Sequence, residues 1–236
     1  MPMIKNTGLM QYPSPQLDNY LGSSDSACGI FEFPDLFTAH KQKQFSAKEV
    51  IYRENDTVDR LFMVHSGMVK LLCYLPNGRV RIIRLHGHNH FLGLEGLVGQ
   101  PYKHTAIAVK DVEMTSISMN DLHLLERDNP QQYCQLLKHG YKQLTQAEKW
   151  IVDFSTGGIK SRVARLVNYL AMLEHGEFSE RVDLLTVNEM ADMLGVTPES
   201  VSRILAEFKR NDTLHKMDGQ SNDTYEINSQ KLQYVS

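Results

Sequence analysis

The sequence predicts an α+β protein in which an N-terminal β-roll is followed by one long helix and a C-terminal winged helix-turn-helix. Three observations predict this fold class. Short strand patterns with turns fill the first half of the chain, a helical stripe with a seven-residue repeat follows, and two short helices joined at a glycine lie near the C-terminus. The predicted segments are a flexible arm (1–30), the β-roll (31–128), the long helix (129–155), a hinge (156–159) and the winged helix-turn-helix (160–236).

The composition is that of a globular protein, since 42% of the 236 residues are hydrophobic and 22% are charged. Residues 1–30 are rich in Ser, Pro, Asn and Gly and show little periodicity, which is typical of a flexible arm. No apolar run approaches the length of a membrane span, and the first residues lack a basic-then-apolar leader. We therefore expect a cytoplasmic protein without a membrane partner.

The β-roll is predicted from strands with clear turn signals. Residues 60–67 end in a glycine turn, 68–75 follow directly, and an Asn-Gly turn at 77–78 leads into the alternating stretch 79–85. An Asn-Gly pair between two strand patterns strongly favours a hairpin. Two more short strands lie within 104–118. Several short strands with regular turns indicate a small closed or sandwich-like β structure.

After a short helix at 121–128, the long helix begins at Pro130 and carries an apolar stripe with alternating spacings of four and three residues. The stripe consists of Tyr133, Leu137, Gly140, Leu144, Ala147, Ile151 and Phe154. It could pack on the chain's own β-roll, but its narrow width favours a partner helix. We therefore predict a homodimer, in which Gly140 lets the two backbones approach closely. Gly157 and Gly158 end the helix and indicate a hinge between domains.

Two short helices with a tight turn form the predicted helix-turn-helix. Thr186 and Glu189 form a capping-box pattern that starts the first helix. Gly195 suits a left-handed conformation at the turn, and Thr197 and Pro198 can cap and open the second helix. A helix presented in this way has the diameter of the major groove of B-DNA. The pattern alone also fits an ordinary helical hairpin with a solvated polar face.

The net charge limits how such a helix can bind DNA. The chain carries −3 overall, and the segment from Gly157 onward holds 9 Lys and Arg against 12 Asp and Glu. This balance argues against a protein that coats nucleic acid nonspecifically. Any DNA affinity must therefore come from a few placed residues and a local basic surface.

In their order, these elements resemble the CRP/FNR superfamily of bacterial transcription regulators, of the cyclic-AMP receptor protein and fumarate–nitrate regulator types. The resemblance spans about Phe45 to Ile227 and is carried by the stretches LFMVHSGMVKLL, FLGLEGLVG, KSRVARLVNYL and TVNEMADMLGVTPESVSRILAEF. It implies a cyclic-nucleotide-binding-like jelly roll, a dimerisation helix and a homodimer that binds double-stranded DNA. It further implies RNA polymerase as a partner and an effector or redox signal sensed by the β-roll.

The family's DNA-contacting residues correspond to the start of the second helix, where ExxSR is typical of the fumarate–nitrate branch. The resemblance therefore implies a palindromic site with TTGA-like half-sites. Arg203 can donate two hydrogen bonds to guanine, Glu199 can accept from a base amino group, and Ser202 fits against a thymine methyl. In the alternative, Glu199 and Arg203 form only a surface ion pair. The predicted DNA-binding residues are Thr197, Glu199, Ser200, Ser202 and Arg203.

The effector pocket that the resemblance implies departs from the cyclic-nucleotide branch at the ligand-holding positions. Leu94 stands where that branch has a ribose-binding Glu, and His104-Thr105 stands for its phosphate-binding Arg-Ser. Cyclic AMP is therefore disfavoured, and so is an iron–sulfur cluster, because only Cys28 lies near the N-terminus. The sequence leaves open haem with a diatomic gas, a small organic acid, a nucleotide in an altered pocket, or no effector. The implied pocket comprises Gly93, Leu94, Glu95, His104, Thr105, Ala147 and Glu148.

The histidines of the stretch HGHNH, residues 86–90, allow a second function. His88, His90 and Glu95 fit the pattern HxHxxxxE, which holds a divalent metal in cupin-type β-barrels. The alternative is a metal-dependent β-barrel enzyme, or a sensor that binds metal or haem. The apolar stripe and the ExxSR helix would have no role in an enzyme, and the histidines also fit a surface turn. We therefore expect a regulator that is not an enzyme; the sequence does not decide between activation and repression.

Overall fold

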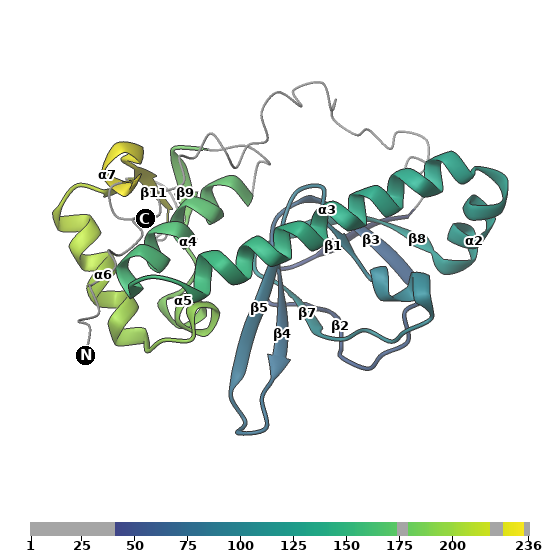
Figure 1. Ribbon diagram of the computed structural model, residues 1–236, viewed down its shortest axis with the longest axis horizontal. Coiled ribbons are helices and arrows are strands. Elements are labelled where there is room, and N and C mark those ends of the chain that lie inside the picture. The colour runs from purple at the N-terminus through teal and green to yellow at the C-terminus, as the bar shows by residue number, and fades with distance from the viewer. Residues whose placement is uncertain (1–40, 174–178, 218–223, 234–236) are drawn as a thin grey trace, which may run out of the picture. The chain divides into compact units, whose positions relative to one another are not determined.

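The computed structural model of the chain describes residues 41–173, 179–217 and 224–233. The predicted arm and Cys28 lie outside these residues. No helix in the described ranges is long and apolar enough to cross a membrane. Residues 39–236 form one compact unit, in which strands come first and helices follow (Figure 1), so the predicted α+β class is confirmed.

Two four-stranded antiparallel sheets form the β-roll, with strand orders β1-β8-β3-β6 and β2-β7-β4-β5. The strands are β1 (Lys41–Phe45), β2 (Val50–Tyr52), β3 (Arg60–Ser66), β4 (Val69–Tyr74), β5 (Val80–His86), β6 (Phe91–Leu92), β7 (Thr105–Ala108) and β8 (Val112–Ser118), and a short 3-10 helix, η2, spans Leu94–Val98. Apolar side chains of both sheets, including Phe62, Val69 and Met114, share one core. The predicted hairpin is confirmed as β4 and β5. Strand β1 is not among the predicted strands, because its sequence KQKQF shows no alternation of apolar and polar residues.

A β-bulge in the β4–β5 hairpin changes which side chains share a face. The register shifts between Leu71 and Leu72, and this leaves Ile83 as an extra residue in β5. Strict alternation would put Ile82 and Leu85 on opposite faces, yet both are buried in the same core. The polar residues of β5 are thereby turned towards a cavity.

Three helices follow the β-roll: α2 (Met119–Asp128), α3 (Pro130–Ser155) and α4 (Ile159–Leu173). The predicted start of the long helix is confirmed, because Pro130 is its first residue and the Asn129 side chain accepts from the Gln132 N–H. The helix ends before Gly157, whose φ of 80° is a left-handed conformation that suits glycine. The predicted break is present, and its role as a hinge stays a prediction.

The C-terminal part contains the helix-turn-helix and a three-stranded sheet with the order β10-β11-β9. Its elements are β9 (Arg181–Asp183), α5 (Val187–Leu194), α6 (Pro198–Arg210), β10 (Leu214–Lys216), β11 (Thr224–Ile227) and α7 (Ser229–Gln233). The antiparallel pair β10 and β11 forms the wing of the predicted winged helix-turn-helix. Residues 218–223 between them lie outside the described ranges.

One apolar core joins the β-roll to the C-terminal helices. From the β4–β5 hairpin and the residue before it, Met68, Leu72, Ile82 and Leu85 pack with residues of α4, α5 and α6. Two ion pairs cross the same contact. Lys70 Nζ lies 2.6 Å from Glu189 Oε1, and Lys110 Nζ lies 2.7 Å from Asp183 Oδ2. The two parts that the sequence separates at residues 156–159 are therefore packed against each other.

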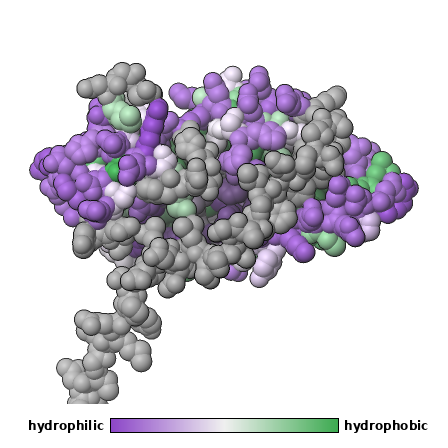
Figure 2. Space-filling model, turned by 90° about the horizontal axis from the view of Figure 1, so that it is seen from above, coloured by the Kyte–Doolittle hydropathy of each residue, from purple (hydrophilic) through white to green (hydrophobic). Residues whose placement is uncertain are grey.

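The described part of the face drawn in Figure 2 is mostly hydrophilic, and its hydrophobic residues form only small patches. Helix α3 nevertheless exposes several large apolar side chains. These are Leu137, Tyr141, Leu144, Ile151 and Val152. A row of exposed apolar residues along one helix is typical of a surface that contacts another protein.

Candidate nucleic-acid interface and effector pocket

The helix-turn-helix is held by the local hydrogen bonds that its sequence predicts. Thr186 Oγ1 accepts from the Glu189 N–H at 3.3 Å, and Glu189 Oε2 accepts from the Thr186 N–H at 3.1 Å. Gly195 ends α5 with a φ of 64°. At the start of α6, Thr197 Oγ1 accepts from the Ser200 N–H at 3.4 Å. The capping box, the glycine turn and the second cap are thus confirmed.

Helix α6 has one buried and one exposed face. The buried residues are Val201, Ile204, Leu205 and Phe208. Thr197, Glu199, Ser202 and Arg203 are exposed and Ser200 is half-buried. Among the ion pairs of the described residues there is none between Glu199 and Arg203. The predicted DNA-binding residues therefore lie together at the start of the helix, where a groove-reading helix presents its base contacts.

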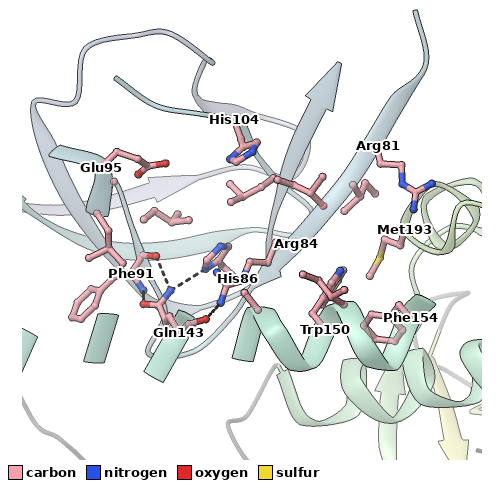
Figure 3. A pocket seen from close by; sticks show the side chains of 18 of the residues that line it. Arg81, Arg84, His86, Phe91, Glu95, His104, Gln143, Trp150, Phe154 and Met193 are labelled. Carbon is pink, nitrogen blue, oxygen red and sulfur yellow. Dashed lines mark hydrogen bonds between the residues drawn. The ribbon is translucent and has the colours of Figure 1, made fainter. Parts of the chain in front are cut away.

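A cavity of about 740 Å³ lies between the β-roll and α3. Its walls come from β5, from the segment around β6, from α3 and, through Met193, from the first helix of the helix-turn-helix. Figure 3 shows labelled side chains from these elements around the cavity, together with His104 from the loop before β7. The volume falls within the range of small-molecule sites. Much of the lining is apolar and includes Ile82, Phe91, Leu94, Trp150, Phe154 and Met193.

Most of the implied pocket residues line this cavity, namely Gly93, Leu94, Glu95, His104 and Ala147. Thr105 does not line it, because its buried Oγ1 accepts from the Glu54 N–H at 3.1 Å. Glu148 faces solvent, about 100° around the helix from Ala147. Thr105 and Glu148 therefore lie outside this cavity, and their assignment to an effector pocket stays a prediction.

The polar wall of the cavity is absent from the prediction. Arg81, Arg84 and His86 of β5 and Gln143 of α3 all line it. The β5 positions do not follow from simple alternation, because the bulge at Ile83 changes the facing of the strand. Gln143 lies outside the apolar stripe that the sequence shows along α3.

Gln143 fixes the orientation of His86. Its Oε1 accepts from the Phe91 N–H at 2.8 Å, so its Nε2 group is the donor. Nε2 donates to Phe91 O at 3.1 Å and to His86 Nδ1 at 3.4 Å. His86 Nδ1 is therefore an acceptor, and the neutral ring carries its proton on Nε2. In this tautomer Nε2 has no lone pair for a haem iron, so His86 does not fit the haem candidate.

Burial sets the protonation states around the cavity. It lowers the pKa of His86 well below the usual histidine value, and His90, Arg84 and His104 lower it further. Burial also lowers the pKa of the Arg84 guanidinium, but arginine stays protonated in proteins. At neutral pH a neutral imidazole therefore lies beside a positively charged guanidinium.

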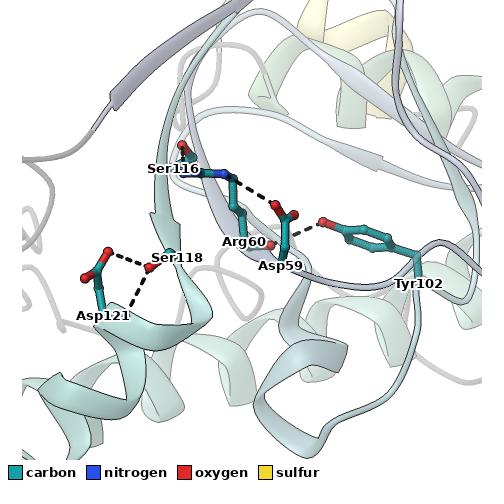
Figure 4. Close-up of polar contacts among 6 residues, drawn as sticks. All are labelled: Asp59, Arg60, Tyr102, Ser116, Ser118 and Asp121. Carbon is teal, nitrogen blue, oxygen red and sulfur yellow. Dashed lines mark hydrogen bonds and ion pairs between the residues drawn. The ribbon is translucent and has the colours of Figure 1, made fainter.

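The loop that leads to His104 is held by polar contacts of Tyr102 and Arg60 (Figure 4). The Tyr102 hydroxyl donates to Arg60 O at 3.2 Å. The Arg60 side chain donates to Ser116 Oγ at 3.4 Å and lies 3.6 Å from a carboxylate oxygen of Asp59. The Tyr102 bond holds the loop to strand β3, and the Arg60 side chain links β3 to β8.

The metal ligands considered for the alternative function do not converge. His88 Nδ1 donates to His65 O at 2.7 Å, and His90 Nδ1 accepts from the Gly87 N–H at 3.0 Å. Glu95 accepts from the backbone N–H of Lys103 at 3.5 Å. In the described parts of the chain, no three His, Cys, Asp or Glu side chains are placed to hold a metal ion. His88 and His90 instead bond to separate backbone partners.

Two family models match the chain in the order of its structural parts. The cyclic nucleotide-binding domain model matches residues 42–129, which contain nearly all of the β-roll and α2. The Crp-like helix-turn-helix domain model matches residues 164–231, which contain α5, α6 and the wing strands.

Characterised relatives are similar over most of this chain. Transcriptional regulator LdrP of Thermus thermophilus is 27% identical over 175 residues, covering 71% of this chain and 84% of LdrP. Transcriptional activator protein FnrA of Stutzerimonas stutzeri is 27% identical over 169 residues, covering 70% of this chain and 69% of FnrA. The solved structure of FixK2 from Bradyrhizobium japonicum has a TM-score of 0.72 at 21% identity, covering 84% of this chain and 97% of FixK2.

These matches support a regulator and give no support to the metal-dependent enzyme. The fold agrees with the solved structure of FixK2, and the two matched domains lie in the same order as the structural parts of the chain. The chain therefore belongs to the CRP/FNR family and is an effector-controlled, DNA-binding transcription regulator.

Proposed function

We propose that the chain acts as a homodimer that reads a palindromic DNA site with TTGA-like half-sites. The observation that carries this proposal is the start of α6, where Glu199, Ser202 and Arg203 are exposed together. Arg203 has the donors for a bidentate contact with guanine, and Glu199 can accept from a base amino group. Because the net charge is −3, DNA recognition depends on such specific side-chain contacts rather than on general attraction to phosphate.

The exposed face of α3 supports the homodimer. Leu137, Leu144 and Ile151 lie seven residues apart and are 46%, 54% and 64% exposed. This spacing is typical of one position of a coiled-coil heptad. A second copy of α3 would bury these side chains about a two-fold axis, and two recognition helices related by that axis match a palindrome.

The apolar stripe predicted for α3 is divided between two contacts. Ala147 lines the cavity, and Phe154 is buried beside Trp150. Gly140 faces the side chain of Leu94 in its own β-roll. That side of the glycine is covered by its own chain, and the expectation that Gly140 brings two copies of the helix together stays a prediction. The helix packs on its own chain along one edge of the stripe and exposes the other.

The cavity is the proposed effector site. One wall is α3, which also carries the proposed dimer face, and another includes Met193 of the helix-turn-helix. A ligand there contacts the dimer helix and the DNA-binding part at once, so differential binding can shift their arrangement. RNA polymerase is a further proposed partner, inferred from the transcription regulators that the chain resembles.

Fluorescence anisotropy with the full-length protein tests this function, without and with candidate effectors. We expect saturable binding to a duplex with two inverted TTGA half-sites, weaker binding when one half-site is scrambled, and a fall in affinity with added salt. Sedimentation should give twice the monomer mass of 27.0 kDa. Equal affinity for the scrambled duplex under all conditions, or a monomer at concentrations that bind DNA, would overturn the proposal.

A further inference from the structure

We propose that the cavity binds a small organic anion whose carboxylate contacts Arg84 and the Nε2–H of His86 and whose apolar body packs against Trp150. This inference rests on the effector role proposed for the cavity and adds the chemical class of the effector. Three observations carry it: a buried donor without a partner, a guanidinium without a carboxylate partner among the described residues, and an apolar lining around both (Figure 3).

His86 supplies the donor. Its side chain is 3% exposed and lines the cavity, and its Nε2 atom has no hydrogen-bond partner among the described residues. Gln143 donates to Nδ1, so the proton of the neutral ring is on Nε2. A buried N–H without an acceptor is unfavourable, and a ligand oxygen reaching it from the cavity removes that cost. The missing partner is therefore an acceptor rather than a metal or a donor.

Arg84 supplies positive charge two residues away on β5. Its guanidinium donates to Gln143 O, and none of the ion pairs of the described residues includes it. Arg81 also lines the cavity, whereas Glu95 is the one carboxylate among the lining residues. This imbalance favours an anion. The planar guanidinium and the imidazole N–H together match the two oxygens of a carboxylate.

The rest of the lining favours a ligand whose remaining part, beyond the carboxylate, is apolar. Ile82, Phe91, Trp150 and Met193 surround the basic wall, and the volume of about 740 Å³ accommodates an aromatic or branched aliphatic group. A free phosphate or a small dicarboxylate would leave this apolar surface uncovered. A monocarboxylate satisfies the basic wall and removes the apolar lining from water at the same time.

Intrinsic fluorescence gives a direct measurement, because Trp150 is the only tryptophan of the sequence and lines the cavity. The full-length protein is titrated with benzoate, 4-methylbenzoate and hexanoate, and with the neutral amides benzamide and hexanamide. We expect a saturable change with the acids and at least about tenfold weaker binding of the matched amides, since a charge-assisted contact is lost.

Variants identify the basic wall. Arg84→Gln should weaken binding of the acids about tenfold or more, and Arg84→Lys, which keeps the charge, should restore part of it. His86→Leu should weaken binding without lowering the thermal midpoint, because the unsatisfied N–H disappears with the ring. Arg79→Gln is the matched control, since it removes an exposed arginine from the same hairpin and should bind like the parent.

The outcomes separate this inference from the proposed function. Equal binding of acids and amides, or unchanged acid binding by a folded Arg84→Gln variant, overturns the inference. A response to inorganic phosphate or cyclic AMP alone also overturns it, because the recognised group would then be a phosphate. Specific DNA binding without any response to millimolar acids defeats the inference and leaves the proposed function standing. Loss of DNA recognition under every condition defeats the proposed function itself.

Discussion

Arg203 and Glu199 owe their proposed role to position rather than to the charge of the surrounding domain. Both are exposed on the first turns of α6, next to residues that are buried in the core. The segment from Gly157 onward contains more acidic than basic residues, so a general attraction to phosphate is weak. We therefore expect each proposed base contact to contribute a large share of the specificity.

Arg203→Ala is expected to weaken binding to the palindromic duplex about 10- to 100-fold, because a bidentate contact with guanine is worth about 1–3 kcal/mol. Anisotropy titrations at one salt concentration measure the change. Arg79→Ala removes an exposed arginine of the β-roll and serves as the control. Equal affinities of the two variants would contradict the role of Arg203.

His90 makes stability depend on pH. Burial lowers its pKa from 6.5 to about 4, and Arg84 and His139 contribute. The unfolded chain therefore binds this proton at a higher pH than the folded chain. The stabilisation from neutral His90 is complete above pH 6.5 and is lost as the pH falls towards 4. We expect the free energy of unfolding to fall by about 2 kcal/mol between pH 7 and pH 5 through this residue.

Urea unfolding of the parent and of His90→Asn at both pH values measures this contribution. The asparagine Oδ1 can keep the acceptor for the Gly87 N–H, so the variant should fold and lose about 2 kcal/mol less on acidification. The same pH dependence in both proteins would show that His90 does not titrate in this way.

Among the elements, helix α3 makes two different contacts. Towards its own chain it is held by polar bonds, with His139 Nε2 donating to Asn89 O at 2.6 Å and Gln143 bonded to Phe91. Away from its own chain it exposes leucine and isoleucine at heptad spacing. The helix is thus suited to pass a change in the cavity to a dimer interface.

Leu144→Glu is expected to convert the proposed dimer to a 27.0 kDa monomer, because a charge would be buried in the centre of the proposed apolar contact. Sedimentation velocity measures the mass. Leu124→Glu on α2 is the matched control, since Leu124 is 48% exposed and Leu144 is 54% exposed. A Leu144→Glu protein that stays dimeric would rule out this face of α3 as the interface.

For the whole molecule, the contact between the β-roll and the helix-turn-helix decides how a signal can travel. Helix α5 packs against β5, and the shared core includes residues from both parts. The Lys70–Glu189 pair at 2.6 Å lies in this contact with side chains only 18% and 19% exposed. Glu189 also belongs to the capping box of α5, so the ion pair ties the β-roll to the first helix of the DNA-binding motif.

Lys70→Met is expected to lower the free energy of unfolding by about 1–2 kcal/mol, because it leaves the carboxylate of Glu189 partly buried without its partner. Lys160→Met is the control. Its pair with Glu207 has side chains 43% and 37% exposed and should contribute about 0.5 kcal/mol or less. Urea unfolding at neutral pH compares the two variants. Equal losses of unfolding free energy would mean that the buried pair stabilises the fold no more than the exposed one.

Much of the fold follows from the sequence because its signals are local. The capping box at Thr186, the left-handed Gly195 and the start of α3 at Pro130 each depend on neighbours within a few residues, and all three are present. The Asn-Gly hairpin is equally local. The same locality explains why β1 is not predictable, since KQKQF becomes a strand only by pairing with β8.

The sequence by itself determined the fold class, the order of the elements and the exposed residues at the start of α6. Only the tertiary structure decided the polar wall of the cavity. Arg84 and His86 face the cavity because of a bulge that depends on pairing with β4. Gln143, which lies 57 residues after His86 in the chain, reaches the cavity from α3. Met193 reaches it from the helix-turn-helix. Such long-range contacts depend on how elements pack, which short sequence patterns do not encode.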